Sequence, residues 1–429
     1  MARNARRIGQ RLSRPYTLGG VIATLGLLVV VLPISCSQGC NHNNPELGTA
    51  PLGTPSVRVL VRENVTQAAI TATQPPNMRI GGSAARPVNL ARGASVNVTL
   101  RPSGWTIGTA VLGAGELILE PSVEGSLRVD GQAYRGRLRF VPMGGPGKFD
   151  VINDVDVDGY VMSVVPKEMF PQWHPEAYRA QAIVARTYAL YVAHTASAGA
   201  QFDLFADTRS QVYGGIGSET PKSREAVDVT RGIVVAHGPP GQEKVFKAYF
   251  SSCCGGVTQS AADAFGEPYQ QALSEQNIGP RCTESPRFNW PTITMRKTEL
   301  TRRIRQWGVN NNEPEKSIAD ISRIDIESNN QFGRPRRFII TDVRGNRYSL
   351  NSEDFRHAVN TDATDHVTLG SSFCKPVNDP TQIRFTEGHG FGHGVGLCQW
   401  CAEHEAASGV RHETIVLSAF PGTKLVRAY

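Results

Sequence analysis

The sequence predicts an α+β fold with an N-terminal membrane anchor, an antiparallel β-rich domain, a region built on one buried central helix, and a small α/β subdomain. Three observations lead to this prediction. Short runs of alternating apolar residues, separated by glycine, proline and asparagine, fill residues 56–155. One long helical pattern follows at 175–195, and helix-like segments alternate with strand-like segments across 290–373.

Residues 1–34 predict an export signal or a membrane anchor. Five arginines between residues 3 and 14 precede an almost uncharged stretch at 16–34. Because basic residues stay on the cytoplasmic side, we expect the remaining chain on the extracytoplasmic face of the cell membrane. Cys36 would suit a lipoprotein, but Pro33 and Ile34 fit a lipobox poorly, so a retained helix or an ordinary cleaved signal is preferred. The polar segment 35–55 predicts a flexible tether.

The charge of the chain gives no support to nucleic-acid binding. The formal net charge is +7, and the five N-terminal arginines leave only +2 for the rest of the sequence. That remainder holds no basic run and no helix-turn-helix or zinc-finger pattern. We therefore expect no nucleic-acid partner.

The β-rich domain, residues 56–155, is predicted from four apolar runs with period-two alternation. These runs are Val57–Val61, Ser95–Leu100, Leu117–Leu119 and Arg137–Phe140. No catalytic constellation accompanies them, so a structural or glycan-contacting role is expected for this domain.

The next region, 156–289, contains the strongest helix signal of the chain, from Pro175 to about Thr195. Proline suits the first helical position, where its missing N–H costs nothing. Apolar residues surround the helix on nearly all sides, which predicts a buried helix. Arg186 in its middle must therefore be paired, either in a core ion pair or with a carboxylate or anionic ligand in an active site.

Glu168 is the first candidate for catalysis. Its neighbours Pro166, Met169, Phe170 and Trp173 would strip water from the carboxyl group and raise its pKa towards the working pH. An acid catalyst needs such a pKa. The alternative is a loop glutamate that points into water.

The second candidate is the glycine- and histidine-rich segment 388–400, within a C-terminal part at 374–429. Glycine at every second position predicts unusual backbone dihedrals or a close approach to another group. The segment lacks the endings of phosphate-binding loops. His389 and His393, with Phe391 between them, suit sugar contacts, proton transfer or a metal, and a structural loop is the alternative.

A third group of candidates places hydroxyl and amide side chains beside glycine turns. It comprises Asp207, Gln211 and Tyr213 in one segment and Ser251 in another. Such side chains can orient a saccharide by hydrogen bonds, although ordinary strand turns have the same composition.

The small α/β subdomain, 290–373, is predicted from helix-like patterns at 299–307 and 352–358. Strand-like patterns at 321–326 and 337–341 complete it.

Taken in order, several motifs resemble the stage II sporulation protein D (SpoIID) family, which also contains the amidase enhancer of a cell-wall lytic system. They cover the chain from about residue 57 to its end. The motifs are Tyr160–Met169, the helix 175–189 with its Ala-Gln-Ala and Ala-Arg-Thr-Tyr-Ala runs, Asp207 with 211–213, 251–256, 392–396 with Gln399, and 420–423.

The resemblance implies lytic transglycosylase activity on peptidoglycan, between N-acetylmuramic acid and N-acetylglucosamine, in cell-wall remodelling or a sporulation-like engulfment. It implies that Glu168 acts first as acid and then as base, that 1,6-anhydro-muramyl ends form, and that no cofactor is required. A hydrolase would need a second carboxylate, for which Asp207 is the only candidate. The expected substrate-binding residues are Arg186, Tyr188, Gln211, Tyr213, Ser251, His393 and Gln399.

Two rival functions stay open. The enhancer branch of the family implies a non-enzymatic protein that binds peptidoglycan and stimulates a cell-wall amidase. A zinc- or thiol-dependent redox protein would instead use the Cys398-x-x-Cys401 spacing. Many relatives have serine and glycine where this chain has Cys398 and Cys401, and some have histidine in place of Phe250.

Six cysteines lie beyond the tether, at positions 253, 254, 282, 374, 398 and 401. Outside the membrane an even number favours disulfides. Cys253, Cys254, Cys398 and Cys401 would alternatively suit a structural zinc site, as in some family members, and free thiols are the third alternative.

Overall fold

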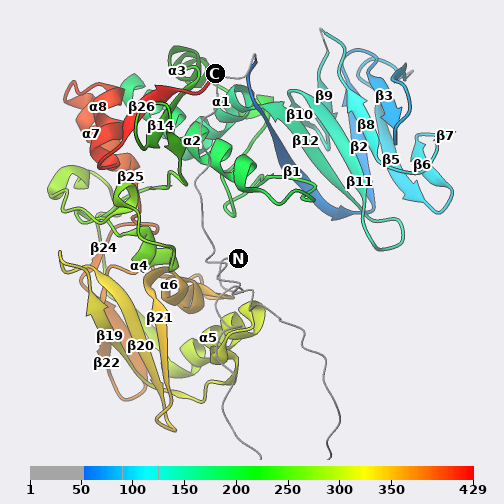
Figure 1. Cartoon of the computed structure of the whole chain (residues 1–429). Coiled ribbons are helices and arrows are strands. Elements are labelled where there is room, and N and C mark those ends of the chain that lie inside the picture. Colours follow the sequence, from blue (N-terminus) through cyan, green and yellow to red (C-terminus); the bar gives the residue numbers. More distant parts are fainter. Residues whose placement is uncertain (1–52, 89, 124) are drawn as a thin grey trace, which may run out of the picture. The chain divides into compact units, whose positions relative to one another are not determined.

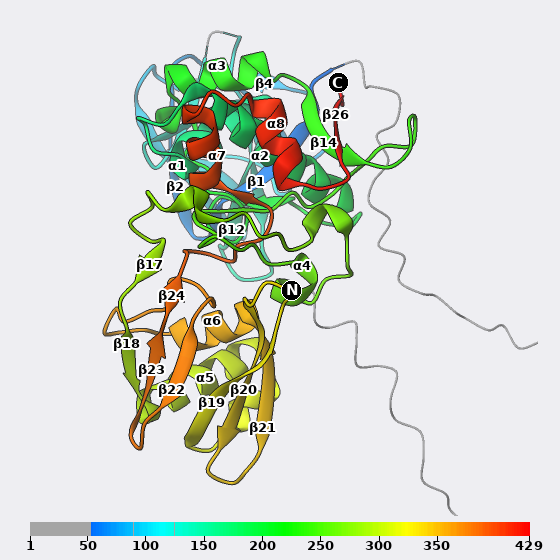
Figure 2. The ribbon, with the colours of Figure 1, turned by 90° about the vertical axis from the view of Figure 1, so that its left-hand side faces the viewer.

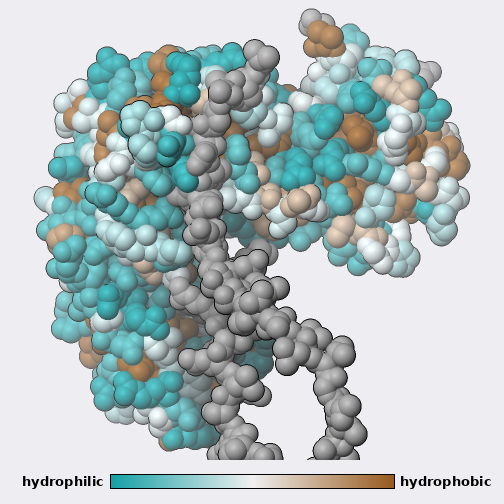
Figure 3. Space-filling model, viewed as in Figure 1, coloured by the Kyte–Doolittle hydropathy of each residue, from teal (hydrophilic) through white to brown (hydrophobic). Residues whose placement is uncertain are grey.

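The computed structural model describes residues 53–88, 90–123 and 125–429 (Figure 1). The predicted anchor at 1–34 and nearly all of the predicted tether lie outside these residues, so both stay predictions. Within the described ranges, no helix combines the length and the apolar character that a bilayer crossing requires. On the face shown in Figure 3, hydrophobic residues are scattered among hydrophilic ones.

The strands of the β-rich domain form two sheets. They are β1 Ser56–Val65, β2 Gln67–Ala72, β3 Asn77–Ile80, β4 Arg86–Pro87, β5 Ser95–Arg101, β6 Gly104–Ile107, β7 Ala110–Val111, β8 Leu117–Glu120, β9 Leu127–Val129, β10 Gln132–Tyr134, β11 Arg137–Pro142 and β12 Phe149–Asp156. The order is β13-β1-β12-β11-β8-β3-β4 in one sheet and β10-β9-β2-β5-β6-β7 in the other. Among the described strands of these two sheets, the short β13, Leu204–Phe205, pairs in parallel with β1, and the other pairs are antiparallel.

Alternating burial explains these strands. Buried and half-buried residues alternate along β2 and β8, as they must when one face of a sheet covers a core. Trp105 lies in that core, with its ring centroid 5.1 Å from that of Phe149. All four runs predicted as strands are strands of antiparallel sheets.

Helix α1, Val157–Glu168, follows β12 without a loop. The side chain of Asp156 accepts a hydrogen bond from the N–H of Gly159 and caps the helix. This helix was not predicted, because Gly159, Pro166 and four valines all lower its helix propensity. Its burial against α2 decides its conformation instead.

Helix α2, Pro175–Thr195, is the predicted central helix, with His174 as its N-cap and proline at its start. Thirteen of its residues are buried. It contacts α1, α3 Pro221–Val229, α7 Gln399–Ala407, α8 His412–Ala419 and strand β14 Ile233–His237, and Figure 2 shows α7 and α8 near it. Strand β14 lies between β15 Lys244–Val245 and β26 Lys424–Arg427 in a three-stranded sheet. Contacts with these helices and with β14 explain why α2 lacks a polar face.

The small subdomain has its own hydrophobic core. Its helices are α5 Lys297–Asn311 and α6 Ser352–Asn360, and its sheets are β19 Ile321–Asn329 with β20 Pro335–Asp342 and β21 Arg347–Asn351, and β18 Ile293–Arg296 with β23 Gln382–Thr386 and β22 Lys375–Asn378. The predicted end at residue 373 is therefore too early. Ile383 and Phe385 of β23 belong to the same core because β23 pairs with β18.

Short elements connect these parts. They are η1 Ile216–Ser218, β16 Phe250–Ser251, α4 Ala261–Phe265, η2 Gln271–Leu273, η3 Pro280–Cys282, β17 Asn289–Trp290, η4 Pro314–Ser317, β24 Gly388–His389 and β25 Leu397–Cys398.

The glycine-rich segment has the unusual backbone dihedrals and the close approach to another group that its composition predicts. Gly394 and Gly396 have φ values of 72° and 70°, and a Cβ on Gly396 would lie 2.1 Å from the carbonyl oxygen of Tyr249.

Candidate active site

Glu168 is the last residue of α1, and its side chain is half-buried. Burial raises the pKa of its carboxyl group, which the N–H of Val212 and the amide of Gln399 partly offset. The unpaired carbonyls at the C-terminal end of a helix also disfavour a negative charge. This carboxyl group therefore holds its proton to a higher pH than an exposed glutamate does.

Two hydrogen-bonding groups face the carboxyl group from segments distant in sequence. The N–H of Val212 donates to Oε1 of Glu168 at 3.3 Å. The amide of Gln399 comes near enough to lower the pKa of Glu168, although its Nε2 makes no hydrogen bond of standard geometry. Gln211, beside Val212, is 1% exposed, and neither of its amide atoms has a partner. Buried polar atoms without partners are costly, and they are expected where a ligand or water completes the site.

Behind the carboxyl group, tyrosines fill the space below α1. Tyr160 lies two helical turns before Glu168 on the same face of the helix and stacks on Tyr213, with ring centroids 5.1 Å apart. The hydroxyl of Tyr213 donates to Oδ1 of Asn153 at 2.7 Å, within the core. Tyr213 was predicted to bind substrate. In the structure its ring packs against Tyr160 and its hydroxyl is bonded within the core, so it supports Tyr160.

An aromatic cluster adjoins Glu168 and Gln399 in sequence. It consists of Phe170, Trp173 and Trp400, with centroid distances of 5.0 Å from Trp173 to both Phe170 and Trp400. Phe170 is 48% exposed. The sequence did not suggest that Trp400 meets the segment after Glu168, because 227 positions separate it from Trp173 in the numbering.

Ser251 and Gln399 come together through the short pairing of β16 with β25. Ser251 pairs with Cys398, the residue immediately before Gln399. The glycine-rich segment covers this pair, since a Cβ on Gly392 would lie 3.2 Å from Cβ of Ser251. The structure thus gathers Glu168, Gln211, Ser251 and Gln399 of the predicted residues in one region.

Tyr188 and His393 are connected through the ring of Tyr249, and Tyr188 also interacts with Tyr160 and Ser210. The rings of Tyr188 and Tyr249 are 6.2 Å apart, and those of Tyr249 and His393 are 5.6 Å apart. Nδ1 of His393 accepts a hydrogen bond from the N–H of Val395 at 3.0 Å, and burial lowers its pKa to about 4. His393 is therefore a neutral residue that shapes its loop, and no contact among the described residues joins it to Glu168.

Arg186 is wholly buried, and its guanidinium pairs with Asp158 of α1 at 2.9 Å. It also donates to the carbonyl of Ile233 at 3.1 Å. These contacts match the core ion-pair interpretation. The ion pair ties Arg186 to α1, whose far end carries Glu168, and the predicted contact with substrate stays a prediction.

Asp207, the candidate for a second carboxylate, has no hydrogen bond to Glu168 among the described residues. Its side chain is exposed and pairs with Arg209 at 2.8 Å. Among the described residues, no carboxylate contributes to the pKa shift of Glu168.

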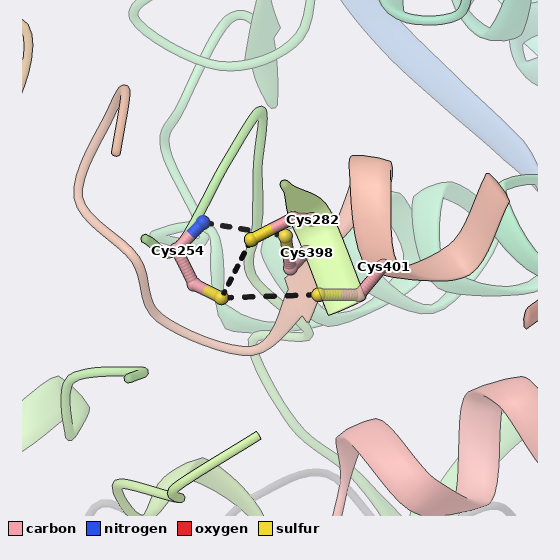
Figure 4. A group of neighbouring side chains, drawn as sticks. All are labelled: Cys254, Cys282, Cys398 and Cys401. Atoms are coloured by element: carbon pink, nitrogen blue, oxygen red, sulfur yellow. Dashed lines mark hydrogen bonds between the residues drawn. The ribbon is translucent and has the colours of Figure 1, made fainter. Parts of the chain in front are cut away.

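Four cysteine sulfurs cluster next to this region (Figure 4). Those of Cys254, Cys282, Cys398 and Cys401 all lie within 4.8 Å of one another, and all four residues are buried. All six described cysteines are free thiols, in contrast to the expected disulfides. The predicted group of four cysteines contained Cys253, whereas the observed cluster contains Cys282. Nothing in its local sequence signals this, because it is an isolated cysteine in η3.

A second group that could hold an ion is Glu176, His412 and Glu413. Its members already satisfy one another, since Glu176 accepts hydrogen bonds from both the N–H and Nδ1 of His412. Glu413 in turn pairs with Arg411.

Comparison with known proteins found a matching family model and several similar proteins. A family model described as SpoIID, stage II sporulation protein, matches residues 146–237, which include Glu168, α2 and Gln211. An uncharacterized protein of Brachyspira hyodysenteriae is 30% identical over 301 residues, which cover 70% of this chain and 73% of that protein. The amidase enhancer of Bacillus subtilis is 22% identical over 94% of this chain and 61% of its own length. Stage II sporulation protein D of Bacillus subtilis is 26% identical over 65% of this chain and 76% of its own.

Proposed function

The chain belongs to the stage II sporulation protein D (SpoIID) family, and from this membership we propose that it cleaves the glycan strands of bacterial peptidoglycan by lytic transglycosylation. The observation that carries the proposal is a solitary carboxyl group, Glu168, whose pKa is raised by burial. We also propose that residues 1–34 anchor the chain in the cell membrane and that the reaction takes place on the extracytoplasmic side.

In the first step, protonated Glu168 gives its proton to the oxygen that links N-acetylmuramic acid to N-acetylglucosamine. The bond between that oxygen and the anomeric carbon of the muramic acid breaks, and the N-acetylglucosamine end leaves as an alcohol. A raised pKa leaves more of the acid protonated at a given pH than in an exposed glutamate, which favours this step. The N–H of Val212, 3.3 Å from Oε1, then stabilises the carboxylate that forms.

In the second step, the carboxylate of Glu168 takes the proton of the muramyl C6 hydroxyl. The C6 oxygen forms a bond to the anomeric carbon and closes the 1,6-anhydro ring. The proton given away in the first step is thereby recovered, and no water is consumed. One carboxyl group suffices for both steps, in agreement with the exposed, paired state of Asp207.

Side chains around Glu168 suit a sugar chain. The amides of Gln211 and Gln399 carry unpartnered polar atoms that can bind hydroxyl and N-acetyl groups. The exposed ring of Phe170 and the half-buried ring of Trp400, 5.9 Å apart, can pack on the apolar faces of sugar rings.

Incubation of the purified protein with isolated sacculi tests the proposal. Wild-type protein should release soluble muropeptides, and Glu168→Gln should release them at least ~100-fold more slowly. Glu387→Gln, which alters an exposed carboxyl group in the small subdomain, is the matched control and should keep full activity. Equal release by Glu168→Gln and wild type would contradict the proposal.

A second candidate function rests on the similarity to the amidase enhancer, which extends over 94% of this chain. In that case the protein binds peptidoglycan and stimulates a separate cell-wall amidase without cleaving glycan itself. Sacculus binding with no soluble product, together with amidase stimulation unchanged by Glu168→Gln, would favour this function over the first.

A further inference from the structure

Four sulfur atoms from three separate stretches of the chain meet beside the candidate active site. Cys254 follows β16, Cys282 ends η3, and Cys398 and Cys401 lie at the start of α7. The exposed fraction of each residue is 5% or less. Figure 4 shows the four side chains converging on one point. Thiols rarely converge in this way by chance, since four weakly polar groups gain little from one another.

The spacing of the sulfurs matches a tetrahedral metal centre. The Sγ atom of Cys254 lies 3.7 Å from that of Cys282 and 3.9 Å from that of Cys401. Zinc bound by four thiolates at about 2.3 Å places its sulfurs about 3.8 Å apart. We propose that Cys254, Cys282, Cys398 and Cys401 bind one structural zinc ion as thiolates, and that this ion holds Gln399 and Trp400 in position beside Glu168.

Neighbouring groups suit the charge of such a centre. Four thiolates and one zinc ion carry a net charge of −2. The N–H of Cys254 donates to Sγ of Cys398 at 3.3 Å, a contact that stabilises a bound thiolate. A negative centre also suits Arg334, whose guanidinium is wholly buried.

Arg334 has no salt bridge to a carboxylate in the described part of the chain. Its guanidinium donates to the carbonyls of Cys254 at 3.0 Å, Val257 at 2.7 Å and His393 at 3.1 Å. Its guanidinium also lies over the Phe373 ring at 5.3 Å, and the carboxylate of Glu353 attracts it without a direct ion pair. A buried cation without a paired anion is costly, so a further negative charge close by would stabilise it. The zinc centre would add to the charge of Glu353.

The other two described cysteines do not belong to the centre. Cys253 lies outside the group of four, and its sulfur is 4.0 Å from the carbonyl oxygen of Cys282. Cys374 is buried in the core of the small subdomain. A cavity of about 210 Å³ borders two of the four ligands, Cys398 and Cys401.

The position of the ligands gives the ion a role in the candidate active site. Cys398 and Cys401 flank Gln399 and Trp400, so their bonds to zinc would fix the first turn of α7. That turn points the Gln399 amide at Glu168 and holds the Trp400 ring against Trp173, 5.0 Å away. Zinc is therefore a positioning element and takes no part in the proton transfers.

Metal analysis of the full-length protein, purified without added metal, tests the inference directly. We expect about one zinc per chain, and thiol titration should find four protected cysteines that react only after a strong chelator is added. Replacement of zinc by Co²⁺ should give the visible absorption of a tetrahedral thiolate centre. Metal-free protein, iron in place of zinc, or two disulfides by intact mass would overturn the inference.

Variants locate the ligands. Cys282→Ser should lose most of its zinc, and Cys374→Ser, another buried cysteine, should keep it. Equal loss from both variants, or full zinc in Cys282→Ser, would contradict the assignment. Should Cys282→Ser fail to fold, the metal content and the Co²⁺ spectrum of the wild-type protein still decide the question.

The positioning role has its own readout, which does not depend on glycan cleavage. Chelation should shift the tryptophan fluorescence of the wild-type protein, and the shift should be largely absent in Trp400→Phe. An identical shift in Trp400→Phe would show that the ion does not hold this turn. Because zinc content and fluorescence are measured without substrate, failure of this inference is distinguishable from failure of the proposed function.

Discussion

The backbone N–H of Val212 lies 3.3 Å from Oε1 of Glu168 and joins the loop after β13 to the end of α1. This contact opposes the effect of burial on the same carboxyl group. The carboxyl group is thus a stronger base than ordinary glutamate, while its anion is still stabilised. An acid that must later act as a base needs both properties.

The rate of glycan cleavage should depend on pH through Glu168. Its pKa lies above the usual value for glutamate, so the protonated acid should persist to higher pH and the rate should fall as pH rises through that pKa. Release of muropeptides measured from pH 4 to 9 checks this. A rate that rises steadily across that range would contradict the role of Glu168 as acid.

Gln399→Leu provides a sharper form of the same experiment. The Gln399 amide lowers the pKa of Glu168, so its loss should raise that pKa further and move the fall in rate to higher pH. An unchanged profile would show that Gln399 does not interact with the carboxyl group.

Glu168→Gln should stabilise the protein at neutral pH. A pKa raised by folding means that the carboxyl group favours the folded state when it is protonated and loses this contribution as pH rises through the folded pKa. We expect the melting temperature of Glu168→Gln to exceed that of wild type by about 1–3 °C at pH 7 and to match it near pH 4. Calorimetry at both pH values measures this, and a lower melting temperature at pH 7 would contradict burial of the charge.

Arg186→Met should destabilise the fold, because it removes the closest cation from the buried carboxylate of Asp158, which keeps the hydroxyl of Tyr429 at 2.8 Å and the more distant Arg231 at 3.7 Å. We expect a loss of about 3–5 kcal/mol in the free energy of unfolding, measured by urea denaturation. Arg411→Met removes an arginine whose side chain is 73% exposed and should change stability by less than ~0.5 kcal/mol. Full stability with weakened sacculus binding in Arg186→Met would support a direct ligand role instead.

Trp400→Ala should weaken binding to sacculi, because it removes one of the two aromatic rings beside Glu168, those of Phe170 and Trp400. We expect roughly 10-fold weaker binding in a pull-down with the Glu168→Gln background, which separates binding from cleavage. Phe332→Ala, which removes an exposed ring in the small subdomain, is the control and should bind normally. Equal effects of the two changes would argue against an aromatic sugar subsite.

The pattern of residues within single elements was sufficient to predict much of the fold and part of the candidate site. The alternation in β2 and β8 and the alanine-rich helix α2 are signals that lie within single elements, and so is the apolar environment of Glu168. By contrast, α1 contains Gly159 and Pro166, and only its packing against α2 makes it a helix.

Long-range pairing explains what the sequence did not show. Cys282 joins the sulfur cluster through the position of η3, Trp400 meets Trp173 through the packing of α7, and β23 joins the small subdomain by pairing with β18. The two interpretations of Arg186 could be separated only by seeing Asp158 at its guanidinium.

Mass spectrometry of the muramic acid ends tests the central claim most directly. Wild-type protein incubated with sacculi should yield ends lighter by one water than those that a muramidase produces from the same sacculi, and Glu168→Gln should yield none. Hydrated ends from the wild-type protein, or anhydro ends that persist in Glu168→Gln, would contradict a single carboxyl group that acts as both acid and base.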